Sequence, residues 1–406
     1  MMKQVVLILC IGLCALNCFA QPTRVFDVNF NNCDEIDAAD GKLGGIGGNP
    51  QCECGVDGMA FRFDGVADSI GYDENIDRIL NQDFALSFYY FLDNTPNDGN
   101  QIDLISFGGA VCDRDSSLTV RYIPQSNNIL AEISTNQQFI FTLRGVIPPN
   151  HCWNYVVINK TNDGLELYIN AELIDENEDF DRNFRFKTDG ILSIGDSQGD
   201  CTNFSNRFTG LIDEIRIYDR VLEESEVISE NLNPDRIITQ DQTIFIDESL
   251  DIVTGNSCSS SFNWSPQTAL DDPMSKFPAA SPIETTSYTY TVDFGTCVST
   301  DSIRISVVDP SISTCDQLFV PNAFTPNDDN RNDEFGISND FIIDDLISFQ
   351  VFSKWGEKLF ETTSLDEKWN GTFNGEPINP GTFLYRVVYI CSGEEFSASG
   401  NFVLLN

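Results

Sequence analysis

The pattern of apolar and polar positions after residue 21 is that of β-strands. In residues 165–170, apolar and polar residues alternate with a period of two, which places successive side chains on opposite faces of a sheet. This segment follows the apolar run 156–158 across Asn162-Asp163-Gly164, which predicts a hairpin. Further short runs bounded by turn residues lie at 84–91, 118–123 and 129–133. Helical periodicity is confined to residues 222–228. The sequence therefore predicts an all-β protein built of antiparallel β-sandwiches.

The strand pattern lapses twice, at Asn-Leu-Asn-Pro-Asp (231–235) and at Asp-Pro-Ser (309–311). We therefore expect three domains in tandem, which we call the head (22–229), the middle (237–309) and the tail (315–406).

The first twenty residues resemble a signal peptide rather than part of a domain. Lys3 precedes an apolar run over 5–19, and small residues at Cys18 and Ala20 suit cleavage after Ala20. Residues 15–17, Ala-Leu-Asn, match the lipoprotein signal before Cys18 poorly, so we do not expect a lipid anchor. The sequence thus predicts export, to the cell surface or the medium.

The net charge excludes several partners. With 23 Lys and Arg against 63 Asp and Glu, the formal charge is −40. Nucleic-acid binding needs clustered cations, and anionic membranes would repel such a surface, so neither is expected. At 41% hydrophobic residues, including 31 Phe, the chain can nevertheless bury sizeable cores.

The cysteines predict disulfides. Of 13, three lie in the leader, and the other ten are Cys33, Cys52, Cys54, Cys112, Cys152, Cys201, Cys258, Cys297, Cys315 and Cys391. They divide among the domains as six, two and two, which in an exported chain indicates full disulfide bonding. Cys258–Cys297 and Cys315–Cys391 are then the intradomain choices, and pairing among the first six stays open. A zinc site is disfavoured, since Cys52-Glu53-Cys54 lacks the two-residue spacer and the chain has a single His.

Six segments of the head carry a family resemblance: 61–68, 84–88, 153–156, 167–170, 192–195 and 208–222. In order and spacing they resemble the laminin-G-like, concanavalin A-like jelly-roll family. The resemblance implies a two-sheet antiparallel sandwich that binds carbohydrate or protein, or that acts as a glycosidase in distant relatives. One departure is Asn170-Ala171, where relatives usually have a Gly suited to positive φ.

Candidate catalytic residues in the head are weak. Enzymes of this superfamily carry paired carboxylates on one strand. The segment nearest to that pattern here, Glu35 to Asp40, lies in a loop-like stretch and ends in Asp where those enzymes use Glu. We interpret it as a solvated acidic loop. His151 has no evident nucleophile partner. We therefore expect no enzyme activity.

A calcium ion is the cofactor that the head sequence suggests. Alternation in 211–217 places Asp213 on the same face as Leu211, Ile215 and Ile217, and a carboxylate on an apolar face needs N–H donors or a cation. Members of the resembled superfamily often hold Ca²⁺ near this position, with Asp27 as the partner here. An Asp213 that is satisfied by hydrogen bonds alone is the alternative.

A sugar site would need exposed aromatic rings beside polar groups. Tyr72, Tyr89, Tyr122 and Trp153 are available, although Trp153 opens an apolar strand and fits a core position.

The middle resembles Ig-like or polycystic-kidney-type repeats of large secreted bacterial proteins. The residues that carry this resemblance are 262–266, 285–292 and 301–308. Such modules are usually spacers, and we interpret the middle as one.

The tail carries five ordered motifs at 320–333, 349–360, 369–375, 380–385 and 400–405. They resemble the gliding-motility-associated C-terminal domain, which in its family is the type B sorting signal of the Bacteroidota type IX secretion system. The resemblance implies that the secretion machinery recognises the folded tail. Asp328, Asn330, Asn332 and Asp333 have the spacing of a calcium loop, but position 12 is Asn339 rather than Glu, and a turn closed by its own side chains is the alternative.

The sequence thus predicts an exported adhesion or carbohydrate-binding protein without catalysis. Two alternatives remain: a polysaccharide hydrolase of the concanavalin A-like class, and a structural surface protein whose head binds another protein.

Overall fold

The computed structural model describes most of the chain after residue 21. The described residues are 22–73, 76–93, 100–108, 116–135, 139–161, 164–178, 180, 183–186, 188, 190–196, 205–255, 259, 261–310, 314–327 and 332–405. The predicted leader, Cys112, Cys201, Cys258, Asp328 and Asn330 lie outside them.

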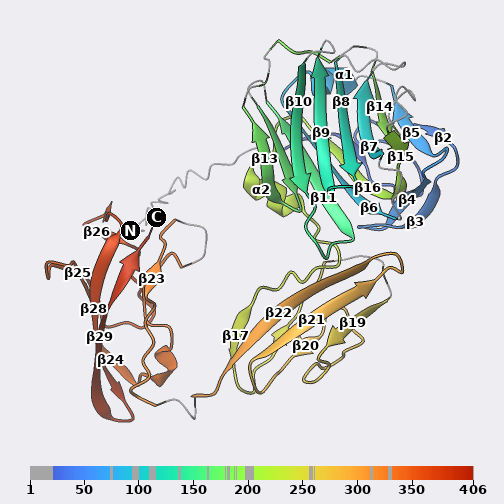
Figure 1. The fold of residues 1–406 in the computed structure, drawn as a ribbon. Helices are drawn as coiled ribbons and strands as arrows, with labels where there is room; N and C mark the ends of the chain where they lie inside the picture. The colour runs from blue at the N-terminus through green and yellow to red at the C-terminus, as the bar shows by residue number, and fades with distance from the viewer. Residues whose placement is uncertain are drawn as a thin grey trace, which may run out of the picture. The chain divides into compact units, whose positions relative to one another are not determined.

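Strands dominate, and the prediction of an all-β fold with several antiparallel sheets is confirmed (Figure 1). The chain divides into two compact units. Unit 1 comprises Met1–Asp241, Asp251–Ala280 and Ser287–Arg304, and unit 2 comprises Gln242–Leu250, Ser281–Thr286 and Ile305–Asn406. Unit 1 therefore holds the head together with much of the middle.

The first sheet of the head has the order β13-β12-β11-β6-β16-β4-β3, and β1 also pairs with β16. The strands are β1 (Arg24–Val28), β3 (Gln51–Cys54), β4 (Met59–Asp64), β6 (Phe84–Leu92), β11 (Trp153–Lys160), β12 (Leu165–Ile169), β13 (Glu172–Asn177) and β16 (Thr209–Tyr218). The predicted antiparallel pairing of β11 with β12 is present, with Ile158 opposite Leu167.

The second sheet has the order β10-β9-β8-β7-β14-β5-β2, and β15 pairs with β7. The strands are β2 (Gly45–Gly47), β5 (Ser69–Tyr72), β7 (Gln101–Gly108), β8 (Ser117–Ile123), β9 (Asn128–Thr135), β10 (Phe139–Val146), β14 (Ile191–Ile194) and β15 (Ser205–Arg207). Figure 1 shows β10, β9, β8 and β7 side by side. Two short helices, α1 (Ile76–Leu80) and α2 (Glu224–Glu230), accompany the sheets.

One apolar core unites the two sheets. Its members come from strands of both sheets, for example Phe63 and Leu86 from the first and Ile105 and Val120 from the second, and all four are fully buried. Phe26 and Val28 of β1 belong to the same core, so the head sandwich includes its first strand.

The turn between β12 and β13 explains the departure at Asn170-Ala171. Both residues have positive φ, 53° and 66°, so the turn keeps the left-handed backbone although it has no Gly. The Asn170 side chain supports it, because Oδ1 accepts a hydrogen bond from Tyr155 N at 2.9 Å.

A β-bulge in β16 overturns the alternation predicted for Asp213. The register shifts between Asp213 and Arg216, and Glu214 has φ +52°. Ile215 consequently packs in the core between the sheets, whereas Leu211 packs in a separate cluster on the outer side of the first sheet. The extra residue of the bulge reverses the faces, so Asp213 does not share one face with both Leu211 and Ile215.

The middle contains the sheet order β17-β22-β21-β19, and β18 pairs with β20. The strands are β17 (Gln242–Phe245), β18 (Leu250–Asp251), β19 (Phe262–Ser265), β20 (Ala279–Ala280), β21 (Thr286–Asp293) and β22 (Val298–Val308). Trp264 is fully buried, with its ring 4.7 Å from that of Tyr290. The Ig-like assignment of the middle stays a prediction.

The predicted pairing of Cys297 with Cys258 is wrong. Cys297 bonds Cys152 of the head, with a Cα–Cα distance of 5.8 Å. Contacts around this bond explain the pairing. The ring centres of Phe294 and Phe91 are 5.2 Å apart, and Arg236 donates hydrogen bonds to the carbonyl oxygens of Asn150 and Thr300. Counting cysteines domain by domain cannot detect a bond that joins two domains.

The remaining described cysteines are also oxidised. Cys33 bonds Cys52, and the predicted bond between Cys315 and Cys391 is present. Cys54 is likewise in a disulfide.

His151 should make this junction sensitive to acid. Burial, reinforced by Arg236, lowers the pKa of His151 to about 4, below its usual 6.5. The folded state therefore favours the neutral imidazole. Above about pH 6.5 His151 causes no loss in the free energy of unfolding, and this free energy falls as the pH drops from there towards 4. We expect urea unfolding of unit 1 to show this loss. A His151→Asn variant should lose less stability over that interval, because carboxylate titration is common to both proteins, and equal losses would contradict the prediction.

The tail forms a five-stranded sheet in the order β23-β29-β28-β24-β25, with a two-stranded sheet of β26 and β27 beside it. The elements are β23 (Ala323–Phe324), η2 (Asp340–Ile342), β24 (Asp345–Phe352), β25 (Lys358–Thr362), β26 (Thr372–Phe373), β27 (Glu376–Pro377), β28 (Gly381–Cys391) and β29 (Glu394–Leu404). Its core is aromatic: Phe335 stacks on Phe402 at 3.5 Å, and Trp369 is buried beside both Phe324 and Phe402.

Candidate functional site

The two outer faces of the head sandwich differ in composition, and the outer face of the first sheet is aromatic and covered. Its buried cluster includes Tyr89, Phe91, Trp153, Tyr155, Tyr168 and Tyr218. Val227 of α2 and Leu232 pack against it, and Tyr89 Oη accepts a hydrogen bond from Leu232 N at 2.7 Å. Phe294 and Cys297 of the middle complete the cover within unit 1. This face is therefore an internal interface rather than a ligand site.

A row of small and polar residues crosses the outer face of the second sheet. Residues directly opposite one another on successive strands form the row Gly45, Gly71, Ser193, Ser106, Thr119, Glu132 and Thr142. The adjacent row consists of Ile70, Ile194, Ile105, Val120, Ala131 and Leu143, all of which belong to the core. Because side chains alternate between faces, the small polar row points away from that core. We call it the polar row.

A buried arginine fixes two carboxylates next to the polar row. Arg121 Nε lies 2.6 Å from Asp103 Oδ1, and its Nη1 lies 2.9 Å from Glu132 Oε2. The side chains of Arg121 and Asp103 are 7% and 3% exposed, whereas that of Glu132 is 21% exposed. The guanidinium therefore holds one carboxylate inside the protein and one at the surface, where its free acceptor capacity can meet a ligand hydroxyl group.

Exposure differs along the row. Ser193 and Ser106 at its centre are buried, while Thr119 is half-buried and Thr142 is exposed. Ser106 Oγ also donates to the carbonyl oxygen of Asp196, whose carboxylate pairs with Arg207 at 3.0 Å. The sequence alone did not predict this row, because strand register brings its residues together and only Thr119 and Glu132 lie in strands that the sequence predicted.

The aromatic residues considered for a sugar site are all buried. Tyr72, Tyr89, Tyr122 and Trp153 are at most 7% exposed. Tyr72 and Tyr122 belong to the core between the sheets, and Tyr89 and Trp153 to the covered face, so none of them offers a stacking platform.

The acidic loop Glu35–Asp40 closes on itself. Asp37 is buried, and its Oδ1 accepts hydrogen bonds from Asp27 N and Ala39 N. Burial raises the pKa of Asp37, and a hydrogen bond between its carboxyl group and that of Asp40 contributes. These hydrogen bonds make Asp37 part of the loop's own structure.

Backbone donors surround Asp213. Its Oδ2 accepts from Val56 N and its Oδ1 from Glu214 N, both at 2.8 Å, and Asp57 N contributes as well. Burial, strengthened by neighbouring Glu214, raises the pKa of Asp213 well above its usual value. Hydrogen-bond donors do not coordinate a cation, so these contacts fit the hydrogen-bonded alternative.

The suggested partner, Asp27, is engaged with arginines instead. Arg24 and Arg216 lie 3.4 and 3.6 Å from its carboxylate oxygens. Among the described residues, no group of three or more His, Cys, Asp or Glu side chains could hold a metal ion. A calcium ion at Asp213 stays a prediction that metal analysis with and without chelator would test.

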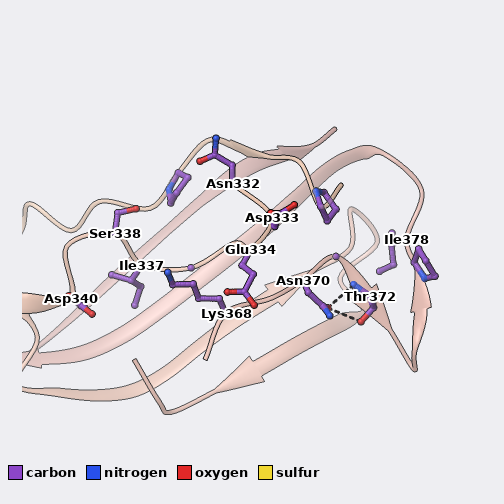
Figure 2. A pocket seen from close by; sticks show the side chains of 15 residues that line it. Asn332, Asp333, Glu334, Ile337, Ser338, Asp340, Lys368, Asn370, Thr372 and Ile378 are labelled. Atoms are coloured by element: carbon purple, nitrogen blue, oxygen red, sulfur yellow. Dashed lines mark hydrogen bonds between the residues drawn. The ribbon is translucent and has the colours of Figure 1, made fainter. Parts of the chain in front are cut away.

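The tail has an open groove of about 1080 Å³ (Figure 2). Asp333, Glu334, Asp340 and Lys368 line it, together with Pro321, Pro326 and Pro377. Asn370 closes a turn at one end, where its Oδ1 accepts hydrogen bonds from the backbone N and Oγ1 of Thr372.

Comparison with known families assigns two segments of the chain. Residues 65–228 match the family model described as the concanavalin A-like lectin/glucanases superfamily, and residues 318–404 match the CHU_C type IX secretion signal domain. The chain carries a laminin G domain and a type IX sorting domain. The predicted export follows: the protein reaches the cell surface or is secreted.

Solved structures of low identity are also similar to the chain. Domain 4 of AbnA, a GH43 extracellular arabinanase from Geobacillus stearothermophilus, is 19% identical, with 52% of this chain and 98% of that chain covered and a TM-score of 0.41. The Ruminococcus gnavus IT-sialidase CBM40 is 20% identical, with 42% and 96% covered and a TM-score of 0.34. No curated protein matches the chain.

The calcium loop predicted in the sorting domain is described only in part. Asp333 Oδ1 accepts a hydrogen bond from Asn327 N at 3.0 Å, and Asn332 O accepts one from Thr325 N at 2.9 Å. Asn332 has φ +55°. These bonds belong to a turn closed by its own polar groups, and calcium there remains a prediction.

The helices described in the laminin G domain and the sorting domain are short. Over the residues described, no helix is long and apolar enough to cross a membrane.

Proposed function

We propose that the protein is a carbohydrate-binding surface protein whose laminin G domain binds a glycan along the polar row. The observation that carries the proposal is the contrast between the two outer faces: one is aromatic and covered, and the other presents the half-buried Thr119, the exposed Thr142 and the fixed carboxylate of Glu132. A sugar chain needs a shallow surface with small side chains and well-placed hydrogen-bonding groups.

The charge of the site favours a neutral glycan. Arg121 is already paired with Asp103 and Glu132, so its charge is compensated within the protein. Sugar hydroxyl groups can donate to Glu132 and exchange hydrogen bonds with Thr119, which lies opposite it. A carboxylated or sulfated sugar would be repelled by Glu132.

Filling the polar row should abolish glycan binding. In Thr119→Trp, the indole would occupy the space between Ser106 and Glu132, its neighbours in register. We expect affinity for the glycan selected on an array to fall at least about tenfold by calorimetry, the order of effect of losing one central contact. The matched control is Ser126→Trp, in the exposed turn between β8 and β9. Equal affinity of both variants for a neutral glycan would contradict the placement of the site.

We also propose binding without catalysis. Incubation with plant and algal polysaccharides should release no reducing sugar. If the protein releases reducing sugar and the Glu35→Gln variant does not, the hydrolase alternative is favoured. If no glycan on the array is bound and a pull-down captures one dominant protein, the structural alternative is favoured.

A further inference from the structure

Trp355 is the most exposed aromatic side chain among the described residues of the sorting domain. Trp355 is 86% exposed, the highest value among the exposed large apolar side chains of the described residues. It lies in the turn between β24 and β25, after Phe352 and before Lys358. The second Trp of this domain, Trp369, is 2% exposed in its core, so the fold does not need Trp355 for packing.

Hydrogen bonds make this turn rigid. Ser353 N donates to Glu357 O at 2.8 Å and Gly356 N to Ser353 O at 2.9 Å, while Ser353 Oγ accepts from the backbone N of Trp355 and of Glu357. Gly356 has φ +86°, which a residue with a Cβ adopts only with strain. Because the backbone of this turn is already fixed, Trp355 loses less conformational entropy on binding a partner than a residue of a flexible loop would.

The sheet beside the turn continues the apolar surface. Phe352 is opposite Leu384, which is 43% exposed, and Leu384 is opposite Asn401, two residues before the 36% exposed Val403. Residues directly opposite and two apart along a strand share a face, so Phe352, Leu384 and Val403 lie on the outer face of the sheet. With Trp355 they form a surface that we call the terminal patch.

Cations gather at the terminal patch although the domain is acidic. The five Lys and Arg residues of the tail are Arg331, Lys354, Lys358, Lys368 and Arg386. Lys354 Nζ lies 5.3 Å from the Trp355 ring centre, and Arg386 shares the face of Leu384 two residues away. Lys358 is opposite Phe352 and pairs with Glu361, and Glu357 lies in the same turn, so Lys354 and Arg386 are the cations of the patch that have no ion pair in the described residues. An apolar surface bordered by Lys and Arg complements a partner pocket that is apolar inside and acidic at its rim.

We propose that the terminal patch is the surface by which the sorting domain docks on the type IX secretion machinery, with Trp355 inserted into an apolar pocket that has an acidic rim. This rests on the assignment of the tail as a sorting domain and adds the contact surface and the chemistry of its partner. Trp at the centre of an interface is among the residues that contribute most to binding.

The test compares full-length variants in a bacterium that has a type IX secretion system. Trp355→Ala should lower the ratio of exported to periplasmic protein at least about tenfold, whereas Trp355→Phe should retain part of the export. The matched control is Phe319→Ala, which removes another exposed ring (61%). The backbone N of Phe319 donates to Asn339 Oδ1, before the start of β24, whereas Trp355 follows the end of that strand. Lys354→Glu with Lys358→Glu should lower export as well, because both changes oppose an acidic rim.

Each outcome decides the proposal. Thermal unfolding of purified full-length Trp355→Ala should match that of the parent, since the ring packs in no core, and loss of export with an unchanged transition supports docking. Normal export of Trp355→Ala, while deletion of residues 315–406 blocks export, overturns the docking surface and leaves the sorting assignment intact. Normal export of Trp355→Ala and of the chain without residues 315–406 overturns the docking surface and the sorting assignment together. Equal loss in Phe319→Ala would also overturn the specific role of the terminal patch.

Discussion

A chain that lacks residues 315–406 should accumulate in the periplasm and fail to reach the surface or the medium. The tail has its own aromatic core around Phe335, Trp369 and Phe402, and the Cys315–Cys391 bond fastens its first residue to the end of β28. The match to a type IX secretion signal domain covers residues 318–404, nearly the whole of the deleted segment. Immunoblots of medium, surface and periplasmic fractions should show the exported share fall to background.

The control for this deletion must separate sorting from folding. Unit 2 also includes residues from the middle, and Phe245 packs on Phe341 of the tail at 5.2 Å, so the truncation exposes part of the middle. Residues 305–406 fused to an unrelated periplasmic protein should therefore be tested in parallel, and we expect the fusion to be exported. Export of the truncated chain at the normal level would contradict the sorting assignment, as would retention of a folded fusion.

Arg121→Leu should destabilise the laminin G domain by about 3–5 kcal/mol, the usual cost of removing one partner from a buried ion pair. Without the guanidinium, Asp103 would remain as a buried carboxylate whose side chain is 3% exposed, and Glu132 would lose its partner. Urea unfolding followed by tryptophan fluorescence and by circular dichroism should show the loss in the transition of unit 1.

A second variant separates charge from packing. Replacing both residues, Arg121→Leu with Asp103→Leu, removes the unpaired buried carboxylate and should recover much of the lost free energy of unfolding. A loss below about 1 kcal/mol in Arg121→Leu, typical of an exposed pair, would show that the network is not effectively buried.

Local patterns were enough to predict the elements of this fold. The alternation in 165–170 predicted β12, and the family resemblance implied a turn at Asn170-Ala171, where both residues adopt positive φ. Such features depend on neighbours in sequence, which a strand pattern records directly. The pairing of Cys315 with Cys391 was predictable for a different reason, because the tail contains only these two cysteines, but the same count gave the wrong partner for Cys297 in the middle.

The face on which a strand residue lies was harder to predict when the strand was irregular. One extra residue at the Asp213–Glu214 bulge reverses the alternation, and it placed Leu211 and Ile215 in different clusters. Bulges depend on how two strands pair rather than on the composition of one strand, so the sequence of β16 alone contained no clear sign of it.

By itself the sequence determined that this protein is exported, is built of β-sandwiches, and ends in a type IX sorting domain, because these properties depend on local patterning and on motifs that stay in order along the chain. Tertiary structure alone decided that Cys152 meets Cys297, that the aromatic face of the head is covered, and that residues from seven strands align as the polar row. Each of these brings together positions far apart in the sequence through strand register and domain packing, and their chemistry becomes visible only when the neighbours in space are known.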